Sequence, residues 1–308
     1  MARSLRIAEN LGITDPVKDA RCTVCHNPLR TLPNSLFTPA ALEKRDTGVS
    51  CETCHGKAES WLRFHTRLDI THEQRVAAGM REMRDLYGRA NVCVACHLNI
   101  DSGLVRAGHP EMFLELDGQT ATQPPHWVEK DNDPWFGPRE WLTGQAADLR
   151  ELSWKLARTP TDEALRARVK GLLWLLRLTH AGSSALKSVE VTDPKAVRTA
   201  ADSLAHTAAH QKWSRDSTAS LLSAMAQSNT SFRDDRLSSD ERRRRAEVLV
   251  QAAGRLWQAL QANGAPPQPL LDTALNLSTN EARAQQAFDP LRFAAALQQV
   301  EVALTLKK

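Results

Sequence analysis

The sequence predicts a mainly α protein in two parts: an irregular part over residues 1–135 and an α-helical bundle or arm over residues 136–308. The first part holds all six cysteines, seven of the ten histidines and many Pro and Gly residues, so we expect short elements there. The second part contains repeated helix start and stop patterns. Neither part shows the alternation of polar and apolar residues that is typical of β-strands.

The helices are predicted from periodicity and capping residues. In the first part, Gln74–Asn91 has a helical pattern that leads into the third cysteine pair. In the second part, Thr159-Pro160 provides an N-cap followed by proline at the first helical position, and we expect the helix that follows to end at Gly182. Its apolar stripe has the spacing of one helix face and consists of Leu165, Val169, Leu172 and Leu176.

Three later helices begin at similar capping patterns. Asp193-Pro194 begins a helix that runs through His206 and His210, and Asp289-Pro290 begins a last helix to about Leu306. Between them, Ser238 to Glu241 forms a capping box that opens a helix to Ala262, before Asn263-Gly264 stops it. The arginine run 242–245 in this helix is expected to be a solvated face, and a docking patch for an acidic partner is the alternative.

Charge and hydropathy exclude two classes of partner. The formal net charge is +4, from 40 basic and 36 acidic residues, which is too balanced for a nucleic-acid-binding protein or one held on an anionic membrane. No apolar run approaches the length of a membrane span; the longest, 171–178, is too short and contains Arg177. The first residues lack the apolar segment of a signal peptide, so any signal segment is expected to be absent from this chain.

Every cysteine belongs to a Cys-x-x-Cys pair that is followed at once by histidine. This pattern is the attachment signature of c-type haem, in which two thiols bond to the porphyrin and the histidine ligates the iron. The sequence therefore predicts three covalently bound haem c groups. The attachment residues are Cys22, Cys25 and His26; Cys51, Cys54 and His55; and Cys93, Cys96 and His97.

Three alternatives to haem attachment exist for such cysteine pairs: structural zinc, disulfides and a thioredoxin-like redox site. Structural zinc normally combines two pairs into four ligands, and three pairs leave one over. A disulfide within each pair would connect nothing distant in the chain. A thioredoxin-like redox pair needs a βαβ setting, which the sequence does not predict. None of these alternatives requires a histidine after each pair.

Seven further histidines are available as the second axial ligands of the three irons. His65 lies in a Trp-Leu-Arg-Phe-His run, His109 lies between Gly108 and Pro110, and His126 lies in Pro-Pro-His-Trp. For each of these three, a structural or surface role is the alternative. Weaker candidates are His72, and the pair His206 and His210, which share one helix face but would more commonly face solvent.

The ordered motifs IAENLG, RCTVCHNP, GVSCETCHG, WLRFH, RANVCVACH, AGHPEMFLELD and PPHW cover roughly residues 3–145. In this region the chain resembles the multihaem c-type cytochromes related to the tetrahaem cytochrome of ammonia oxidisers, the cytochrome c-554-like family. The resemblance implies an irregular multihaem domain with closely packed haems, mostly with two histidine ligands. It also implies that His65, His109 and His126 match the family's ligand histidines.

The chain departs from the family pattern at two places. Members usually carry a further haem motif and a histidine upstream of IAENLG, and some carry a later Cys-x-x-Cys-His; this sequence has neither. One distal ligand could therefore have come from an upstream segment.

The leading functional hypothesis is an exported triheme electron carrier, periplasmic or extracellular, that exchanges electrons with redox partner proteins. The sequence shows no further group of residues with a catalytic pattern. Two alternatives stay open: a subunit of a multihaem redox enzyme with one open haem, and a cytochrome that assembles into a polymer.

Overall fold

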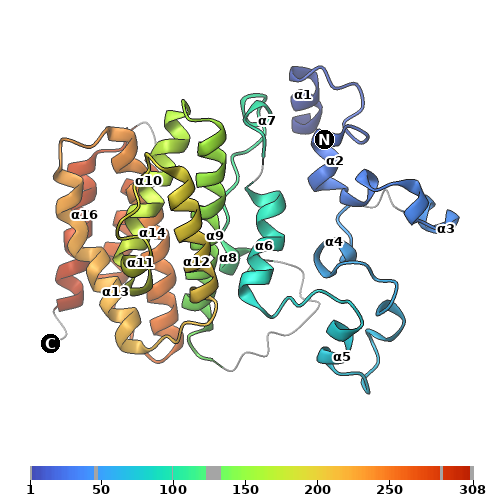
Figure 1. The fold of residues 1–308 in the computed structure, drawn as a ribbon. Helices are drawn as coiled ribbons and strands as arrows, with labels where there is room; N and C mark the ends of the chain where they lie inside the picture. Colours follow the sequence, from blue (N-terminus) through green and yellow to red (C-terminus); the bar gives the residue numbers. More distant parts are fainter. Residues whose placement is uncertain (1, 45–47, 99, 123–132, 285–286, 306–308) are drawn as a thin grey trace. The chain divides into compact units, whose positions relative to one another are not determined.

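The computed structural model describes residues 2–44, 48–98, 100–122, 133–284 and 287–305 of the chain. The chain folds as two compact units, an N-terminal unit, Met1–Leu114, and a C-terminal unit, Glu115–Lys308. The described residues are mainly α-helical and contain no strand, which confirms the predicted fold class (Figure 1). The predicted division between residues 135 and 136 stays a prediction.

Short helices joined by turns make up the N-terminal unit. They are α1 (Ala2–Asn10), α2 (Ala20–His26), η1 (Pro28–Thr31), η2 (Asn34–Leu36), α3 (Pro39–Lys44), α4 (Cys51–His55), η3 (Leu62–Phe64), α5 (His72–Ala77), α6 (Leu86–His97) and α7 (Ser102–Arg106). Isolated helices of this length are marginal in water, because nucleation costs more than a few hydrogen bonds return. These helices therefore depend on caps and on what packs against them.

The single helix predicted over Gln74–Asn91 is wrong, because the structure divides this segment. Helix α5 begins at a capping box formed by Thr71 and Gln74, and it ends before Gly79, whose φ of 102° belongs to the left-handed region. Helix α6 begins again at Asp85, whose carboxylate accepts a hydrogen bond from the Gly88 N–H. The sequence pattern was helical on both sides, but these local caps interrupt it.

The C-terminal unit consists of longer helices. They are α8 (Leu116–Thr122), α9 (Phe136–Arg158), α10 (Glu163–Leu178), α11 (His180–Ala185), α12 (Pro194–Ala208), α13 (Arg215–Gln227), η4 (Ser228–Arg233), α14 (Ser239–Ala262), α15 (Pro269–Arg283) and α16 (Pro290–Thr305). Helix α9 packs against α12, α10 and α8, whereas α14 joins α10 to α13 and α15, and α16 packs on α15 and η4 (Figure 1). The result is a helical bundle.

Aliphatic and aromatic side chains fill the bundle. The predicted stripe on α10 is buried, since Leu165 is 7% exposed and Leu176 is fully buried. An aromatic cluster closes one region of the core, where Phe232 packs edge-on against Phe293 at a ring separation of 4.6 Å and against Trp174 at 5.7 Å. Such edge-to-face contacts add to the stabilisation from burial.

Two predicted helix boundaries in this unit differ from the structure. Thr159 caps the C-terminus of α9, and Asp162 is the N-cap of α10, where its carboxylate accepts from the Leu165 N–H at 2.9 Å. Aspartate provides the stronger acceptor, which places the start three residues later than Thr159-Pro160 suggested. Gly182 does not end α10; it lies inside α11, the short helix that Thr179 caps.

Among the other predicted boundaries, one end is wrong: the helix that begins at Asp193-Pro194 contains His206 but ends at Ala208, because the chain turns at Ala209 before it reaches His210. The remaining ones are confirmed. Asp193 and Ser238 each act as the N-cap of a helix, α12 and α14 respectively. Asn263 is the C-cap of α14, and Gly264 follows with a positive φ of 79°. The last helix begins at Pro290 as expected.

The arginine run in α14 is not a solvated face. Arg243 pairs with Asp240 and Glu247, and Arg245 pairs with Glu241 while its guanidinium lies 5.2 Å from the centre of the Trp174 ring. The side chain of Arg245 is 15% exposed. An arginine side chain can stack on an aromatic ring and pair with a carboxylate at the same time. These arginines therefore form contacts within the bundle.

Two helical glycines should respond in opposite directions to alanine. A Cβ on Gly182 would lie 1.8 Å from the Leu176 carbonyl oxygen, whereas a Cβ on Gly254 in α14 would meet no atom within 4 Å. We expect Gly182→Ala to lower the free energy of unfolding by at least about 2 kcal/mol through overpacking. Gly254→Ala should raise it by up to about 1 kcal/mol, because alanine loses less backbone entropy in a helix. Urea unfolding followed by circular dichroism measures both, and equal effects would contradict the packing described for Gly182.

Candidate functional site

Each Cys-x-x-Cys-His run forms the last turn of a helix. Helix α2 ends at His26, α4 ends at His55 and α6 ends at His97. Residues three apart lie on the same side of a helix, so the two thiols of each pair face one side, and the histidine comes directly after them. The three runs therefore have the same local geometry although the helices differ in length.

Local hydrogen bonds hold the first motif helix. The Asp19 carboxylate caps α2 by accepting the Arg21 N–H at 2.9 Å, and it also pairs with the Arg21 guanidinium. The guanidinium lowers the pKa of Asp19 to about 2, because its hydrogen bond favours the ionised carboxylate. The Thr23 hydroxyl donates to the Asp19 carbonyl and is buried. This cap fixes the turn that carries Cys22 and Cys25.

The second cysteines of the first and third motifs are brought together by the contact between α2 and α6. The interaction between their thiols lowers the pKa of Cys25 to about 7 and raises the pKa of Cys96. Burial raises the pKa of Cys54, whereas the charge of Arg81 lowers it. None of the six cysteines forms a disulfide. Cys96 on α6 thus lies close to the first motif.

His109 lies beside the histidine of the first motif. Its ring centre is 6.3 Å from that of His26. Two imidazoles that share one metal have ring centres about 6 Å apart, given metal–nitrogen bonds of about 2 Å and about 1 Å from each nitrogen to its ring centre. The observed separation is therefore large enough for both imidazoles to bind one metal ion.

The backbone around His109 holds the ring in place. Gly108, with φ of 107°, ends α7, and the Asn10 amide donates to the Ala107 carbonyl at 3.0 Å. The His109 Nδ1 lies 2.9 Å from the Pro110 carbonyl oxygen. Because a carbonyl oxygen only accepts, Nδ1 must carry the hydrogen, which leaves Nε2 as the ligating nitrogen.

His65 has the same arrangement of its ring nitrogens. Its Nδ1 lies 2.5 Å from the Leu62 carbonyl oxygen, and Nε2 is again the nitrogen suited to a metal. Its ring contacts Trp61 edge-on at 6.0 Å, and Trp61 in turn contacts the His55 ring at 6.1 Å. The Trp61 ring is thus in contact with both the proximal histidine of the second motif and a predicted distal histidine.

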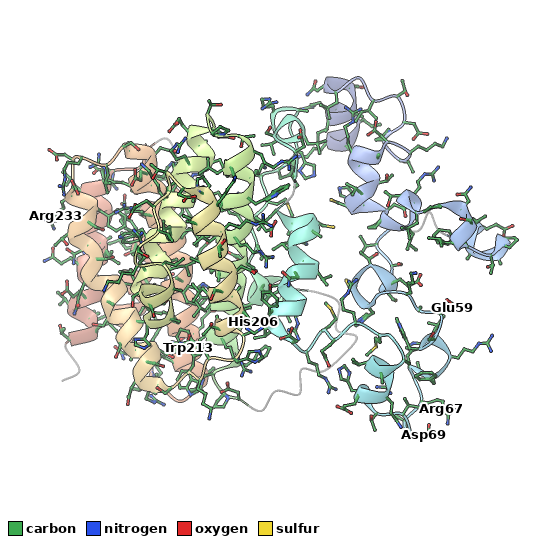
Figure 2. The ribbon with its side chains drawn as sticks, viewed as in Figure 1. Glu59, Arg67, Asp69, His206, Trp213 and Arg233 are labelled. Atoms are coloured by element: carbon green, nitrogen blue, oxygen red, sulfur yellow. The ribbon has the colours of Figure 1, made fainter. Side chains whose placement is uncertain are left out.

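The remaining candidate histidines have different surroundings. His72 engages Glu82 through Nε2, at 2.7 Å. His126 lies outside the described residues. His206 lies in the last turn of α12 and His210 in the turn that follows this helix; both are exposed, and their ring centres are 5.8 Å apart. Figure 2 shows His206 and Trp213 on the C-terminal unit. Their assignment as haem ligands stays a prediction.

The N-terminal unit has little apolar core of its own. Among the described residues it contains twelve buried apolar side chains, against forty-seven in the C-terminal unit. It also carries nine of the thirteen exposed large apolar side chains, including Val24 next to the first motif and Leu68, which is fully exposed. A folded unit of this size normally buries most of its apolar surface, and a large apolar cofactor would cover side chains of this kind.

Buried polar atoms gather around the second motif. The hydroxyl oxygens of Ser50 and Thr53 and the indole nitrogen of Trp61 are buried and make no hydrogen bond. An unmet buried donor costs about 1–3 kcal/mol, so such atoms indicate a missing partner. A haem with its propionates supplies both apolar surface and acceptors, and the residues present fit that group.

The comparisons with known proteins agree with this geometry. Residues 2–56, from α1 to the end of the second motif, match the family model described as cytochrome c554 and c-prime. This segment of the N-terminal unit is therefore similar to the c554-like cytochromes. No curated protein and no solved structure matches the chain. The family match supports an electron-transfer cytochrome, and the family implies covalently bound haem c.

Two further properties of the described residues concern membranes and metal ions. No helix there is both long enough and apolar enough to cross a membrane. No group of three or more His, Cys, Asp or Glu side chains in the described ranges is arranged to hold a metal ion. The sequence gives no signal that the indole nitrogen of Trp61 is buried, because this burial depends on packing with Met80, which is distant in the chain.

We expect His72 to play no part in haem ligation. Its Nε2 is engaged by Glu82, so His72→Gln should leave the absorption spectrum and spin state of the holoprotein unchanged. The loss of this partly exposed pair should lower the free energy of unfolding by no more than about 1 kcal/mol. Glu82→Gln is the matched control. A new high-spin absorption band in His72→Gln alone would show that His72 is a ligand.

Proposed function

We propose that this chain is an exported triheme c-type cytochrome that carries electrons through closely packed haems, most of them ligated by two histidines. The observation that carries the proposal is the gathering of three helices, each ending in Cys-x-x-Cys-His, in a unit with very little apolar core. Covalently attached porphyrins would supply the missing core. The family match over residues 2–56 supports the cytochrome class.

The attachment residues are those of the three motifs. Cys22 and Cys25, Cys51 and Cys54, and Cys93 and Cys96 would form the thioether bonds, and His26, His55 and His97 would ligate the irons. Burial lowers the pKa of His97, which favours the neutral imidazole that a metal requires. Each haem supplies an iron that exchanges one electron.

The distal ligands proposed are His65, His109 and His126. Backbone carbonyls accept from Nδ1 of His65 and His109, which orients both rings before a metal is present. An iron with two fixed imidazoles changes its coordination little when it gains an electron, and this suits electron transfer more than ligand binding. The separation of His109 from His26 supports assigning His109 to the first haem.

The contact between α2 and α6 supports a neighbour relation for two of the haems. Cys96 lies beside Cys25, so the first and third haems would adjoin and could exchange electrons directly.

The proposed location is the periplasm or the extracellular space. Haem attachment needs reduced thiols and a dedicated maturation system outside the bacterial cytoplasm, and the proposed partners are redox proteins. The near balance of charge disfavours nucleic acid as a partner.

The first test is the number of haems. We expect intact-mass measurement of the protein from its native host to show three haems that remain bound after acid–acetone extraction, because thioether bonds survive denaturation. The Cys93→Ala/Cys96→Ala variant should carry two. Haem that extracts completely, or a chain that carries zinc, would contradict the proposal.

The second test concerns the ligand of the first haem. His109→Ala should keep three covalent haems but convert one of the irons to a high-spin or water-ligated form, because the ring facing His26 is lost. Electron paramagnetic resonance measures the spin states. His180→Ala, at an exposed histidine at the start of α11, is the control and should change nothing. An unchanged low-spin spectrum in His109→Ala would exclude His109. A high-spin iron already present in the unmodified protein would favour the open-haem alternative.

A further inference from the structure

We propose that Arg81 is a positioning residue for the second haem-attachment motif and that its charge raises the reduction potential of the haem attached there. The proposal rests on the function proposed above, because it requires a haem at Cys51 and Cys54. It adds a residue that no motif contains and that lies outside the segment matching the family model.

Helix α4, which carries the second motif, is too short to be stable by itself. It has five residues, so most of its carbonyl groups have no partner within the helix. Gly56, with φ of 77°, donates its N–H to the Glu52 carbonyl, and the Glu52 carboxylate accepts from the Ala58 N–H at 2.9 Å. These contacts fix the path of the chain after α4. They do not satisfy the carbonyl groups of the last three residues of the helix.

Arg81 provides those donors from a distant part of the sequence. Its backbone N–H donates to the His55 carbonyl at 2.8 Å, and its Nη1 donates to the carbonyls of Cys54 at 2.9 Å and Thr53 at 3.2 Å. One residue thus binds the carbonyls of the last three residues of α4. It caps the C-terminus of the helix that presents both a thiol and the proximal histidine.

Packing fixes the position of Arg81. The preceding residue, Met80, is 9% exposed and packs with Trp61 and Ala58 in the small apolar cluster of this unit. The Met80 N–H also donates to the Arg75 carbonyl at 3.1 Å. The backbone of Arg81 is therefore held by a buried neighbour and by its N–H bond to the His55 carbonyl, and two hydrogen bonds direct its guanidinium at α4.

The positive charge of Arg81 is expected to raise the reduction potential of a haem bound beside it. The C-terminus of a helix carries a partial negative charge, and Arg81 places a full positive charge on it. Oxidised haem iron has one more positive charge than reduced iron, so a nearby cation favours the reduced state. Arg81 is exposed, and solvent screening limits the size of the effect.

Substitutions at Arg81 separate its charge from its hydrogen bonds. Arg81→Gln removes the charge and keeps a donor, Arg81→Lys keeps the charge without the planar fork, and Arg81→Ala removes both. Arg63→Gln removes the charge of another exposed arginine of the same unit and is the matched control. The potentials of the three haems would be measured by spectroelectrochemical titration, and haem content by intact mass.

The expected results differ among the variants. Arg81→Gln should retain three haems and lower one of the three midpoint potentials, with a change of about threefold to tenfold in its reduced-to-oxidised ratio, where tenfold equals 59 mV. Arg81→Lys should leave the reduced-to-oxidised ratio of each haem, at a given potential, within threefold of that in the unmodified protein. Arg81→Ala should yield chains lacking the haem at Cys51 and Cys54, with the other two haems retained. Arg63→Gln should change neither measurement.

A second variant identifies the haem that responds. In the Cys51→Ala/Cys54→Ala background, which lacks the second haem, Arg81→Gln should no longer shift any potential. Unchanged potentials in Arg81→Gln, or equal shifts in Arg63→Gln, would overturn the charge effect, and full haem content in Arg81→Ala would overturn the positioning role. Absence of the second haem from the unmodified protein would instead refute the proposed function.

Discussion

The arrangement of the N-terminal unit depends on how a short helix ends. A helix whose last residues are Cys-x-x-Cys-His presents two thiols on one side and a histidine directly after them, but it leaves its final carbonyl groups without partners. Helices α2 and α4 have seven and five residues, so their geometry is set by the groups that satisfy these ends. At the start of α2 the Asp19 carboxylate accepts an N–H of the first turn, and at the end of α4 Arg81 donates to the final carbonyls.

The two units are stabilised in different ways. The C-terminal unit is a bundle with an apolar interior, where Phe232, Phe293 and Trp174 pack together and arginines are paired or stacked. The N-terminal unit has few buried side chains and exposes large apolar residues such as Leu62 and Leu68. In the proposed holoprotein, porphyrins would cover these residues, so attachment of the cofactor and folding of this unit would be linked.

Hydrogen bonds to backbone carbonyls orient the imidazole rings of two candidate ligands. The carbonyls of Leu62 and Pro110 each accept from Nδ1 of a histidine, which fixes its tautomer and turns Nε2 outward. His72 shows the opposite arrangement, with Nε2 used by Glu82. This difference separates histidines that have similar sequence surroundings, and it gives a physical reason to rank His65 and His109 above His72.

The sequence by itself determined the helical class, the capped helices that begin at Asp193 and Ser238, and the three cysteine motifs, because these depend on residues within a few positions of one another. Local patterns did not locate the break between α5 and α6 or the start of α10, where competing caps lie close together. Only the tertiary structure brought His109 to His26, Cys96 to Cys25 and Arg81 to Cys54. These pairs are separated by 27 or more residues, and no sequence period relates them. Their contact follows from how the turns at Gly56, Gly79 and Gly108 redirect the chain.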